Sequence, residues 1–244
     1  MTILNILIPM AGKGSRFAVE GYDLPKPLID VNGIPMIQLV IENIKPKIPH
    51  QFIFICLEDH VRKHNIDKFL LSIEPTAKIV LVNQVTGGAA ETAMLASQSV
   101  DQNMPLLIAN SDQYLNFDIN HYINFLEASP SDANIMTMNA TGEKWSFIKK
   151  KGQLVSEVAE KKEISTEATV GIYFFKHGSD FFRYAKNMIE IKDKTLGEYY
   201  VAMVYNYLIR AGLAVDSYNV GNVEDRVYGL GTPSDLRLYL KARG

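Results

Sequence analysis

The chain has 244 residues, of which 47% are hydrophobic, and its 25 Lys and Arg nearly balance its 27 Asp and Glu. The net charge of -2 excludes a broad basic surface for nucleic acid but allows a local anion site. The single cysteine, Cys56, excludes an internal disulfide, and its apolar neighbours predict a buried thiol. Because no apolar run reaches about 18 residues and no signal-peptide pattern is present, we expect a cytoplasmic protein without membrane association.

The first half alternates short apolar runs with helix-like stretches, which is the pattern of βα units. The expected strands are Asn5–Ile8, Phe52–Leu57, Lys78–Asn83 and Leu106–Ala109, and the expected helices are Met36–Ile44, Val61–Ile73, Glu91–Val100 and Ile119–Ala128. Each spacer is long enough for a crossover between parallel strands. The sequence therefore predicts a doubly wound, mostly parallel, Rossmann-like α/β sheet.

After Pro130 the pattern changes to short alternating strands, which predict an antiparallel insertion on the same sheet. These strands are Asn134–Asn139, Trp145–Lys150, Leu154–Ala159 and Thr169–Phe175, with a hairpin turn at Lys151-Gly152. An amphipathic helix with a stripe of core tyrosines is expected over 196–208, ending at Gly212. Thr232 caps a last helix through Lys241. We expect one domain, 1–244, with parts 1–130, 131–231 and 232–244.

A glycine loop follows the first strand, and it has the chemistry of a phosphate-binding segment. Its residues are Ala11, Gly12, Lys13, Gly14, Ser15 and Arg16. The dinucleotide fingerprint fails because Phe17 stands where its third glycine belongs. The P-loop also fails, since Gly14 follows Lys13 where Ser or Thr is required. A plain strand-to-helix turn remains the alternative for this loop taken alone.

The segment Pro25-Lys26-Pro27 fixes one ammonium between two rigid residues. With the preceding Gly12-Lys13-Gly14-Ser15-Arg16, it resembles the N-terminal signature of the sugar-phosphate nucleotidyltransferases, including the glucose-1-phosphate thymidylyltransferases. The resemblance implies that Arg16 and Lys26 act on the triphosphate as catalytic residues. It implies that the nucleotide-binding loop consists of Ala11, Gly12, Lys13, Gly14 and Ser15. Residues 1–130 would be the nucleotide-binding half, and 131–231 the acceptor-binding lobe.

Weaker landmarks extend the resemblance along almost the whole chain. Gln84 and Gly88 would read the edge of the base through amide and backbone hydrogen bonds. In the lobe, Glu160 would accept hydrogen bonds from sugar hydroxyls, Lys161 would meet the acceptor phosphate, and Gly171 would let a sugar ring approach a strand closely. Acceptor specificity would lie around Trp145, Tyr173 and Glu198.

One carboxylate ends a buried strand, and it is the candidate ligand for the Mg²⁺ that the resemblance implies. Asp112 follows that strand, and carboxylate and phosphate oxygens suit this hard cation. Related glycosyltransferases usually have two aspartates here, but Asn110 stands two positions before Asp112. The family often has a second metal-binding aspartate before Gly-Thr, where this chain has Gly229. We therefore take Asp225 as the candidate second ligand, and the alternatives are Glu224 or a surface position for both residues.

The implied reaction joins an NTP and a sugar 1-phosphate, or a similar phosphorylated small molecule, to give a nucleoside-diphosphate product and pyrophosphate. The resemblance places it in sugar-nucleotide and polysaccharide biosynthesis. A catalytically silent nucleotide sensor remains an alternative, because Gly229 stands where the family's second metal-binding aspartate is expected. A nucleotide-sugar glycosyltransferase is disfavoured by Asn110 and by Pro25-Lys26-Pro27. The sequence identifies neither the base nor the acceptor, and it is compatible with both a monomer and a homo-oligomer.

Overall fold

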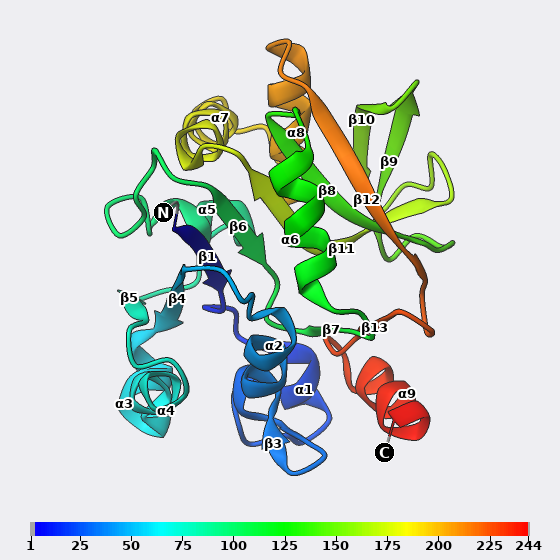
Figure 1. Cartoon of the computed structure of the whole chain (residues 1–244). Helices are drawn as coiled ribbons and strands as arrows, with labels where there is room; N and C mark the ends of the chain where they lie inside the picture. Colours follow the sequence, from blue (N-terminus) through cyan, green and yellow to red (C-terminus); the bar gives the residue numbers. More distant parts are fainter. Residues whose placement is uncertain (1–2, 244) are drawn as a thin grey trace.

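The computed structural model describes residues 3–243, and a nine-stranded sheet forms its centre (Figure 1). The strands run in the order β10 (Leu154–Glu160), β9 (Ser146–Lys151), β11 (Glu167–Phe175), β6 (Leu106–Ala109), β1 (Leu4–Pro9), β4 (His50–Leu57) and β5 (Lys78–Val82), while β8 (Ala133–Asn139) joins β11 and β12 (Val215–Asn222) joins β8. Strands β6, β1, β4 and β5 are parallel, whereas β11 is antiparallel to β6, β8 and β9. The predicted parallel sheet with an antiparallel insertion is confirmed.

Helices cover both faces of the sheet, because successive strand side chains point to opposite sides. Ile6 and Ile8 pack with α2 (Met36–Ile44), α4 (Ile66–Ile73) and α6 (Ile119–Ala128). Leu7, between them, packs on the other face with α5 (Ala89–Met94), α7 (Gly178–Glu190) and α8 (Val201–Arg210). Cys56 is buried as predicted, and burial raises the pKa of its thiol to about 12.

Short elements gather at the carboxyl ends of β1 and β6 (Figure 1). They are α1 (Ser15–Val19), a 3-10 turn η1 (Lys26–Leu28), the pairs β2 (Asp30–Val31) with β3 (Ile34–Pro35) and β7 (Gln113–Leu115) with β13 (Val227–Gly229), and α9 (Pro233–Arg243). Phe17, the residue that breaks the dinucleotide fingerprint, is 1% exposed and packs against Tyr228, Leu236 and Tyr239. This small core places the C-terminal segment beside the glycine loop.

Three expected helices differ from the structure. The helix expected over 91–100 is α5, which begins at Ala89 and ends at Met94, and turns follow it over 95–99. The helix expected over 61–73 is α3 (Glu58–His64) followed by α4, because Asn65 adopts a left-handed conformation with φ of 51°. The helix expected from Leu196 begins only at Val201, since Leu196 has φ of 49° and the backbone of Tyr199 bonds to Gly87 and Ala90. Consequently, Tyr200 lines a cavity, and its assignment to core packing is wrong.

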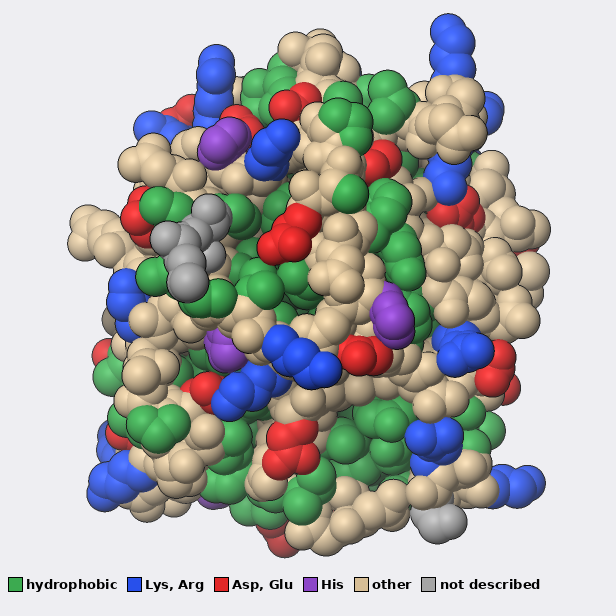
Figure 2. Space-filling model, in the orientation of Figure 1, with side chains coloured by type: hydrophobic (Ala, Val, Ile, Leu, Met, Phe, Trp, Pro, Cys, Tyr) green, Lys and Arg blue, Asp and Glu red, His purple; other side chains and the backbone are tan. Residues whose placement is uncertain are grey.

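The surface seen in Figure 2 has Lys and Arg interspersed with Asp and Glu, so neither charge dominates that face. Within residues 3–243, the helices are all too short or too polar to cross a membrane.

Candidate active site

A central cavity of about 400 Å³ lies at the carboxyl edge of the sheet and brings together five of the predicted site residues. They are Arg16, Asp112, Glu160, Lys161 and Gly171. The same cavity is lined by Trp145, Tyr173 and Glu198, around which acceptor specificity is predicted. Segments distant in sequence therefore meet where open α/β folds place their ligands.

Lys26 and Asp112 form an ion pair at the edge of this cavity. Their Nζ and Oδ2 atoms are 2.7 Å apart, and each side chain is 23% exposed. Pro25, extended with φ of -60°, and the 3-10 turn that follows it fix the backbone of Lys26. Gly14 adopts φ of +62°, and a Cβ added there would lie 3.1 Å from the Cβ of Lys26. The glycine loop and the Pro-Lys-Pro segment are therefore in contact.

The glycine loop is open along its middle. Ala11 is buried, whereas Gly12, Lys13, Ser15 and Arg16 are exposed. A Cβ added to Gly12 would meet no atom within 4 Å. The protein itself therefore leaves free space at Gly12, which a close-lying ligand can use.

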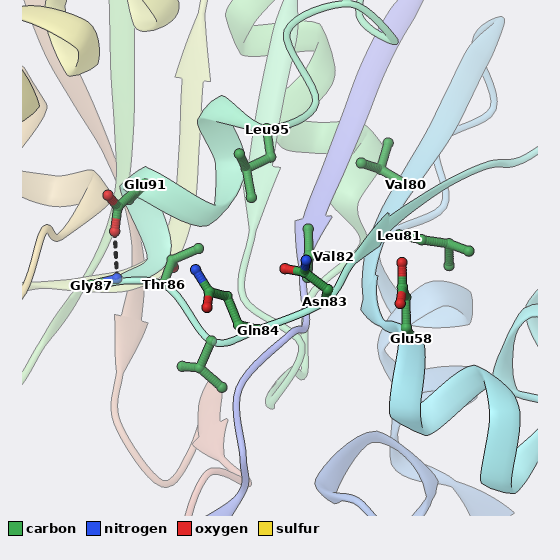
Figure 3. A pocket seen from close by; sticks show the side chains of 11 residues that line it. Glu58, Val80, Leu81, Val82, Asn83, Gln84, Thr86, Gly87, Glu91 and Leu95 are labelled. Carbon is green, nitrogen blue, oxygen red and sulfur yellow. Dashed lines mark hydrogen bonds between the residues drawn. The ribbon is translucent and has the colours of Figure 1, made fainter.

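Gln84 lies in a second depression, which we call the β5 groove. It has a volume of about 630 Å³ and is lined by residues 58, 80–87, 91 and 95, so that the glycine loop takes no part in it. Figure 3 shows Gln84 beside Thr86, with Glu58 across the groove and Glu91 bonded to the N–H of Gly87. Recognition of the base by Gln84 remains a prediction. The chain that follows Gln84 leads to Ala89, which lines the central cavity.

Gly88 has a structural constraint of its own. It adopts φ of +145°, and an added Cβ would lie 2.5 Å from the backbone N and O of Tyr199. The N–H of Ala90 donates to the carbonyl of Tyr199, and the N–H of Tyr199 donates to the carbonyl of Gly87. A glycine at position 88 is thus needed for two backbone segments to meet.

We expect Gly88→Ala to lower the free energy of unfolding by about 2 kcal/mol or more, since it combines a clash with backbone atoms and a strained φ. Gly12→Ala is the matched control, because its added Cβ has free space, and it should leave the melting temperature nearly unchanged. Thermal and urea unfolding of both variants measure the difference. Equal stability of the two variants would contradict this account of Gly88.

The structure does not bring Asp225 to Asp112. The Asp225 side chain is 67% exposed, with its nearest cation, the Arg226 guanidinium, 3.9 Å away, and it lies outside the lining of the central cavity. Asp235, at the start of α9, does line that cavity. A Cβ added to Gly229 would lie 3.7 Å from its Cγ. Asp235 therefore places a carboxylate beside the position where the resemblance leads one to expect a second aspartate.

Asp235 is held by two neighbours and by its own backbone. The Nζ of Lys144 lies 3.1 Å from its Oδ1, and the hydroxyl of Thr232 donates to its Oδ2 at 2.7 Å. Its N–H donates to Oγ1 of Thr232, which confirms that Thr232 is the N-cap of the last helix. The sequence showed only this capping role, because nothing in it places Asp235 beside Gly229.

The lobe supplies a second pair of charged groups to the central cavity. Glu160 accepts a hydrogen bond from the Ser146 hydroxyl, and burial raises its pKa above the usual 4.5. The Nζ of Lys161 donates to the Tyr200 hydroxyl at 3.1 Å, and this bond raises the pKa of Lys161. Lys161 is therefore a cation at neutral pH, facing the same cavity as Glu160.

Two amides, Asn110 and Gln113, complete the cavity next to Gly171, and no sequence motif singles out Gln113. Gly171 adopts φ of +82° at an irregularity of β11, and the side chains of Asn110 and Gln113 fill the space that a Cβ would need, so the close approach expected there of a sugar ring is made by these two amides. Gln113 follows Asp112 directly, and a polar residue after a buried strand is the signal that could have identified it. Its position depends on the three-residue pair β7 and β13, which is too short to be read from a sequence pattern.

The fold and the site define a class, namely an α/β protein whose sheet edge holds a cavity lined by arranged cations and carboxylates. A model of the nucleotidyl transferase family matches residues 6–215, which is most of the chain, and the chain therefore belongs to that family. The predicted identity as an enzyme that transfers nucleotidyl groups is confirmed. A comparison with curated protein sequences gives no match.

Solved structures share the whole fold. A nucleoside-diphosphate-sugar pyrophosphorylase from Vibrio cholerae RC9 is 25% identical, with a TM-score of 0.82 over 97% of this chain and 99% of its own. A protein described as a glucose-1-phosphate thymidylyltransferase from Bacillus anthracis, solved with sucrose, is 20% identical, with a TM-score of 0.78 over 98% and 95%. The inositol-1-phosphate CTP transferase of T. maritima is 13% identical, with a TM-score of 0.77 over 100% and 97%. The last two support the fold alone.

Proposed function

We propose that the chain is a pyrophosphorylase that converts an NTP and a sugar 1-phosphate, or a similar phosphorylated small molecule, into an NDP-linked product and pyrophosphate. The observation that carries this proposal is the contact between the glycine loop and Lys26. The ammonium of Lys26 pairs with Asp112, and Asp112 lines the same cavity as Glu160 and Lys161. One end of the cavity suits a triphosphate, and the other suits a hydroxylated phosphate. The Vibrio cholerae structure, named as a nucleoside-diphosphate-sugar pyrophosphorylase, supports the same class of reaction.

Mg²⁺ fits the donor set of this site when the nucleotide contributes ligands. Asp112 offers a half-buried carboxylate and Asp235 is a second carboxylate of the cavity, while residues 3–243 contain no cluster of three or more acidic, His or Cys ligands. Mg²⁺ is commonly bound by one or two carboxylates together with substrate phosphates. When bound, it would neutralise charge on the phosphates and polarise the α-phosphoryl group.

The chemistry needs no general base from the protein. The second pKa of a phosphate monoester is about 6, so the acceptor oxygen is already ionised at neutral pH. This oxygen attacks the α-phosphorus in line, and the bond to the bridging oxygen of pyrophosphate breaks. Arg16 and Lys26 would stabilise charge on the triphosphate and on the leaving pyrophosphate, while Lys161 holds the acceptor phosphate. Glu160 would orient the acceptor through its hydroxyl groups.

The remaining assignments belong to the same proposal. Residues 1–130 form the nucleotide-binding half, with Gln84 and Gly88 at the base, and 131–231 form the acceptor lobe within one domain. The single buried Cys56 suits a reducing compartment, which supports a cytoplasmic location. A product of this kind would serve sugar-nucleotide and polysaccharide biosynthesis.

Each of the four NTPs should be mixed with Mg²⁺, inorganic pyrophosphatase and a panel of sugar 1-phosphates and polyol phosphates. Phosphate release that requires the NTP, the acceptor and the protein together is the expected result. Nucleotide binding without turnover across the whole panel would contradict the proposal and favour a silent sensor. Hydrolysis of nucleotide-sugars in place of their formation would favour a glycosyltransferase.

The raised pKa of Glu160 gives acceptor binding a pH dependence. The carboxylate is the form of Glu160 that accepts hydrogen bonds from hydroxyl groups. We therefore expect the acceptor KM to rise as the pH falls toward this raised pKa, and to do so at a higher pH than it would for a glutamate of pKa 4.5. The free energy of unfolding depends on pH in the opposite direction. Because the pKa of Glu160 is higher in the folded protein, this group stabilises the fold below pH 4.5, and the stabilisation is lost as the pH rises through the raised pKa.

The check is the ratio of acceptor KM values for the wild type and Glu160→Gln, measured between about pH 8 and about pH 5. Taking the ratio cancels protonation of the acceptor phosphate, which both proteins experience equally. The ratio should shift as the pH falls, and a ratio independent of pH would exclude Glu160 from acceptor binding.

A further inference from the structure

We propose that Asn206 is a positioning residue, which holds strand β10 against helix α8 and thereby aims Glu160 and Lys161 into the central cavity. This inference rests on the proposed function, in which those two side chains bind the acceptor. Asn206 itself lies on α8, outside the lining of the central cavity, so it acts through the strand and does not touch the substrate.

The carboxamide of Asn206 bonds to both backbone polar groups of one residue of β10. The N–H of Val158 donates to Oδ1 of Asn206 at 2.9 Å, and Nδ2 of Asn206 donates to the carbonyl of Val158 at 2.8 Å. One end of the amide accepts and the other donates, so it reproduces the pair of bonds that a neighbouring strand would make. Asn206 therefore takes the place of a strand on the outer side of β10.

Strand β10 lies at the edge of the nine-stranded sheet, and its pairing is irregular. Within the described residues, β9 is the one strand paired with it. The register shifts between Val155 and Glu157, and a bulge of this kind bends a strand and re-aims the side chains near it. After the irregularity, the backbone of β10 is held by β9 on one side and by Asn206 on the other.

Glu160 and Lys161 follow Val158 closely, at the point where β10 ends. Lys161 adopts φ of +50°, and its N–H donates to the carbonyl of Trp145 at 2.9 Å. A residue other than glycine is uncommon in this left-handed region and stays there only where its surroundings fix it. A shift of β10 would therefore move both side chains relative to the cavity.

Helix α8 is a firm support for this end of the lobe. Tyr200, which precedes its first residue, accepts a hydrogen bond from the Lys161 ammonium at 3.1 Å. On the same helix, Val204 and Leu208 pack in the core that contains Leu7 of β1. Since the glycine loop follows β1, α8 connects the acceptor residues to the part of the sheet that carries the nucleotide-binding loop.

A groove of about 490 Å³ between β10 and α8 is lined by Val158 and Asn206 themselves. If the amide is removed, water can enter there and bond to the backbone of Val158. Substitution of Asn206 should therefore release the strand without unfolding the protein.

The test replaces Asn206 with Leu, which has a similar size without polar atoms, and with Gln, which keeps the amide on a longer side chain. Asn187→Leu, at an exposed position of α7, is the matched control. We expect Asn206→Leu to raise the acceptor KM by about 10- to 10²-fold and to leave the NTP KM within about twofold, because misplacement by about 1 Å can cost that much. Asn206→Gln should recover part of the loss, and the control should match the wild type.

A measurement without substrate separates this inference from the proposed function. NMR of the side-chain carboxyl carbons follows the titration of Glu160, whose pKa burial raises above the usual 4.5. If Asn206 holds β10 in place, Asn206→Leu exposes Glu160 and moves this pKa back toward 4.5, whereas Asn187→Leu leaves it unchanged. Absent pyrophosphate release by the wild type would refute the proposed function, and the shift at Glu160 would still demonstrate the positioning by Asn206.

Three results would overturn the inference. An unchanged acceptor KM, or an unchanged pKa of Glu160, in Asn206→Leu would mean that the strand does not depend on this amide. Equal increases of the NTP and acceptor KM, together with a large fall of the melting temperature, would indicate a general structural role. Equal losses in Asn206→Gln and Asn206→Leu would mean that the hydrogen bonds of the amide do not matter.

Discussion

Lys26→Ala is expected to reduce turnover by about 10²- to 10³-fold, which is the usual effect of removing one preorganised donor from developing charge. Lys26 stands between two prolines, its ammonium contacts Asp112 at 2.7 Å, and its Cβ lies against Gly14 of the glycine loop. Neither Lys144 nor Lys161, the lysines that line the central cavity, stands between two prolines. Loss of Lys26 would therefore remove stabilisation of the phosphates that no neighbouring side chain can replace.

The stability of Lys26→Ala should change little, because partly exposed ion pairs contribute only about 0 to 1 kcal/mol. Pyrophosphate release under saturating NTP and acceptor measures the loss of kcat, and thermal unfolding measures stability. Lys68→Ala, at an exposed position of α4, is the matched control and should retain wild-type values of both. Near-normal turnover in Lys26→Ala would remove this residue from the proposed mechanism.

Asp112→Asn is expected to lower turnover by roughly 10³-fold or more, since a bound metal contributes several kcal/mol of charge stabilisation. The substitution keeps the shape of the side chain, which matters because a Cβ on nearby Gly231 would lie 2.5 Å from Oδ2 and the site has no spare space. The loss should appear in pyrophosphate release at every Mg²⁺ concentration. Full activity restored by excess Mg²⁺ would limit Asp112 to a minor role.

Binding of Mn²⁺, followed by electron paramagnetic resonance, tests the same residue without turnover. In the free protein the Lys26 ammonium competes with a metal for the Asp112 carboxylate, so metal binding should be weak without nucleotide and should strengthen in Lys26→Ala. Asp112→Asn should abolish the binding that nucleotide promotes. Asp225→Asn should bind like the wild type, whereas weakened binding in Asp235→Asn would show that this second carboxylate contributes.

Much of the nucleotide-binding half could be predicted because its signals are local. Alternation and apolar runs located β1, β4, β5 and β6 to within two residues at each end, and α2 and α6 were predicted with the bounds that the structure has. The glycine at Lys151-Gly152 was expected to tolerate positive φ, and Gly152 adopts φ of +65°. The pairing of β6 with β1, which the structure shows, then brings Asp112 to the glycine loop.

The unpredicted parts depend on contacts between distant segments. Strand β12 pairs with β8 at the far side of the lobe, and nothing in its own polar sequence indicates a strand. Tyr200 was assigned to a helix by its spacing, but docking of Tyr199 on Gly87 and Ala90 keeps the chain extended there and turns Tyr200 to the cavity. Tertiary contacts overrode local helical periodicity at this position.

The second carboxylate of the cavity shows the same limit. Asp225 was chosen because it is near Gly229 in sequence, but the chain turns it outward beside Arg226. Asp235 is farther along the chain and reaches Gly229 only because Phe17, Leu236 and Tyr239 pack α9 against α1. Packing of a small apolar core, which no motif records, thus determines which carboxylate lines the site.

The most direct measurement is phosphorus NMR of the reaction with Mg²⁺, an NTP and a sugar 1-phosphate or polyol phosphate, without pyrophosphatase. Transfer at the α-phosphorus predicts one pyrophosphate for each new diphosphate-linked product, with the acceptor phosphorus retained in that product. Nucleoside diphosphate with free orthophosphate would instead show attack at the terminal phosphate, and it would contradict the account. So would an unchanged spectrum with every NTP and acceptor, despite nucleotide binding.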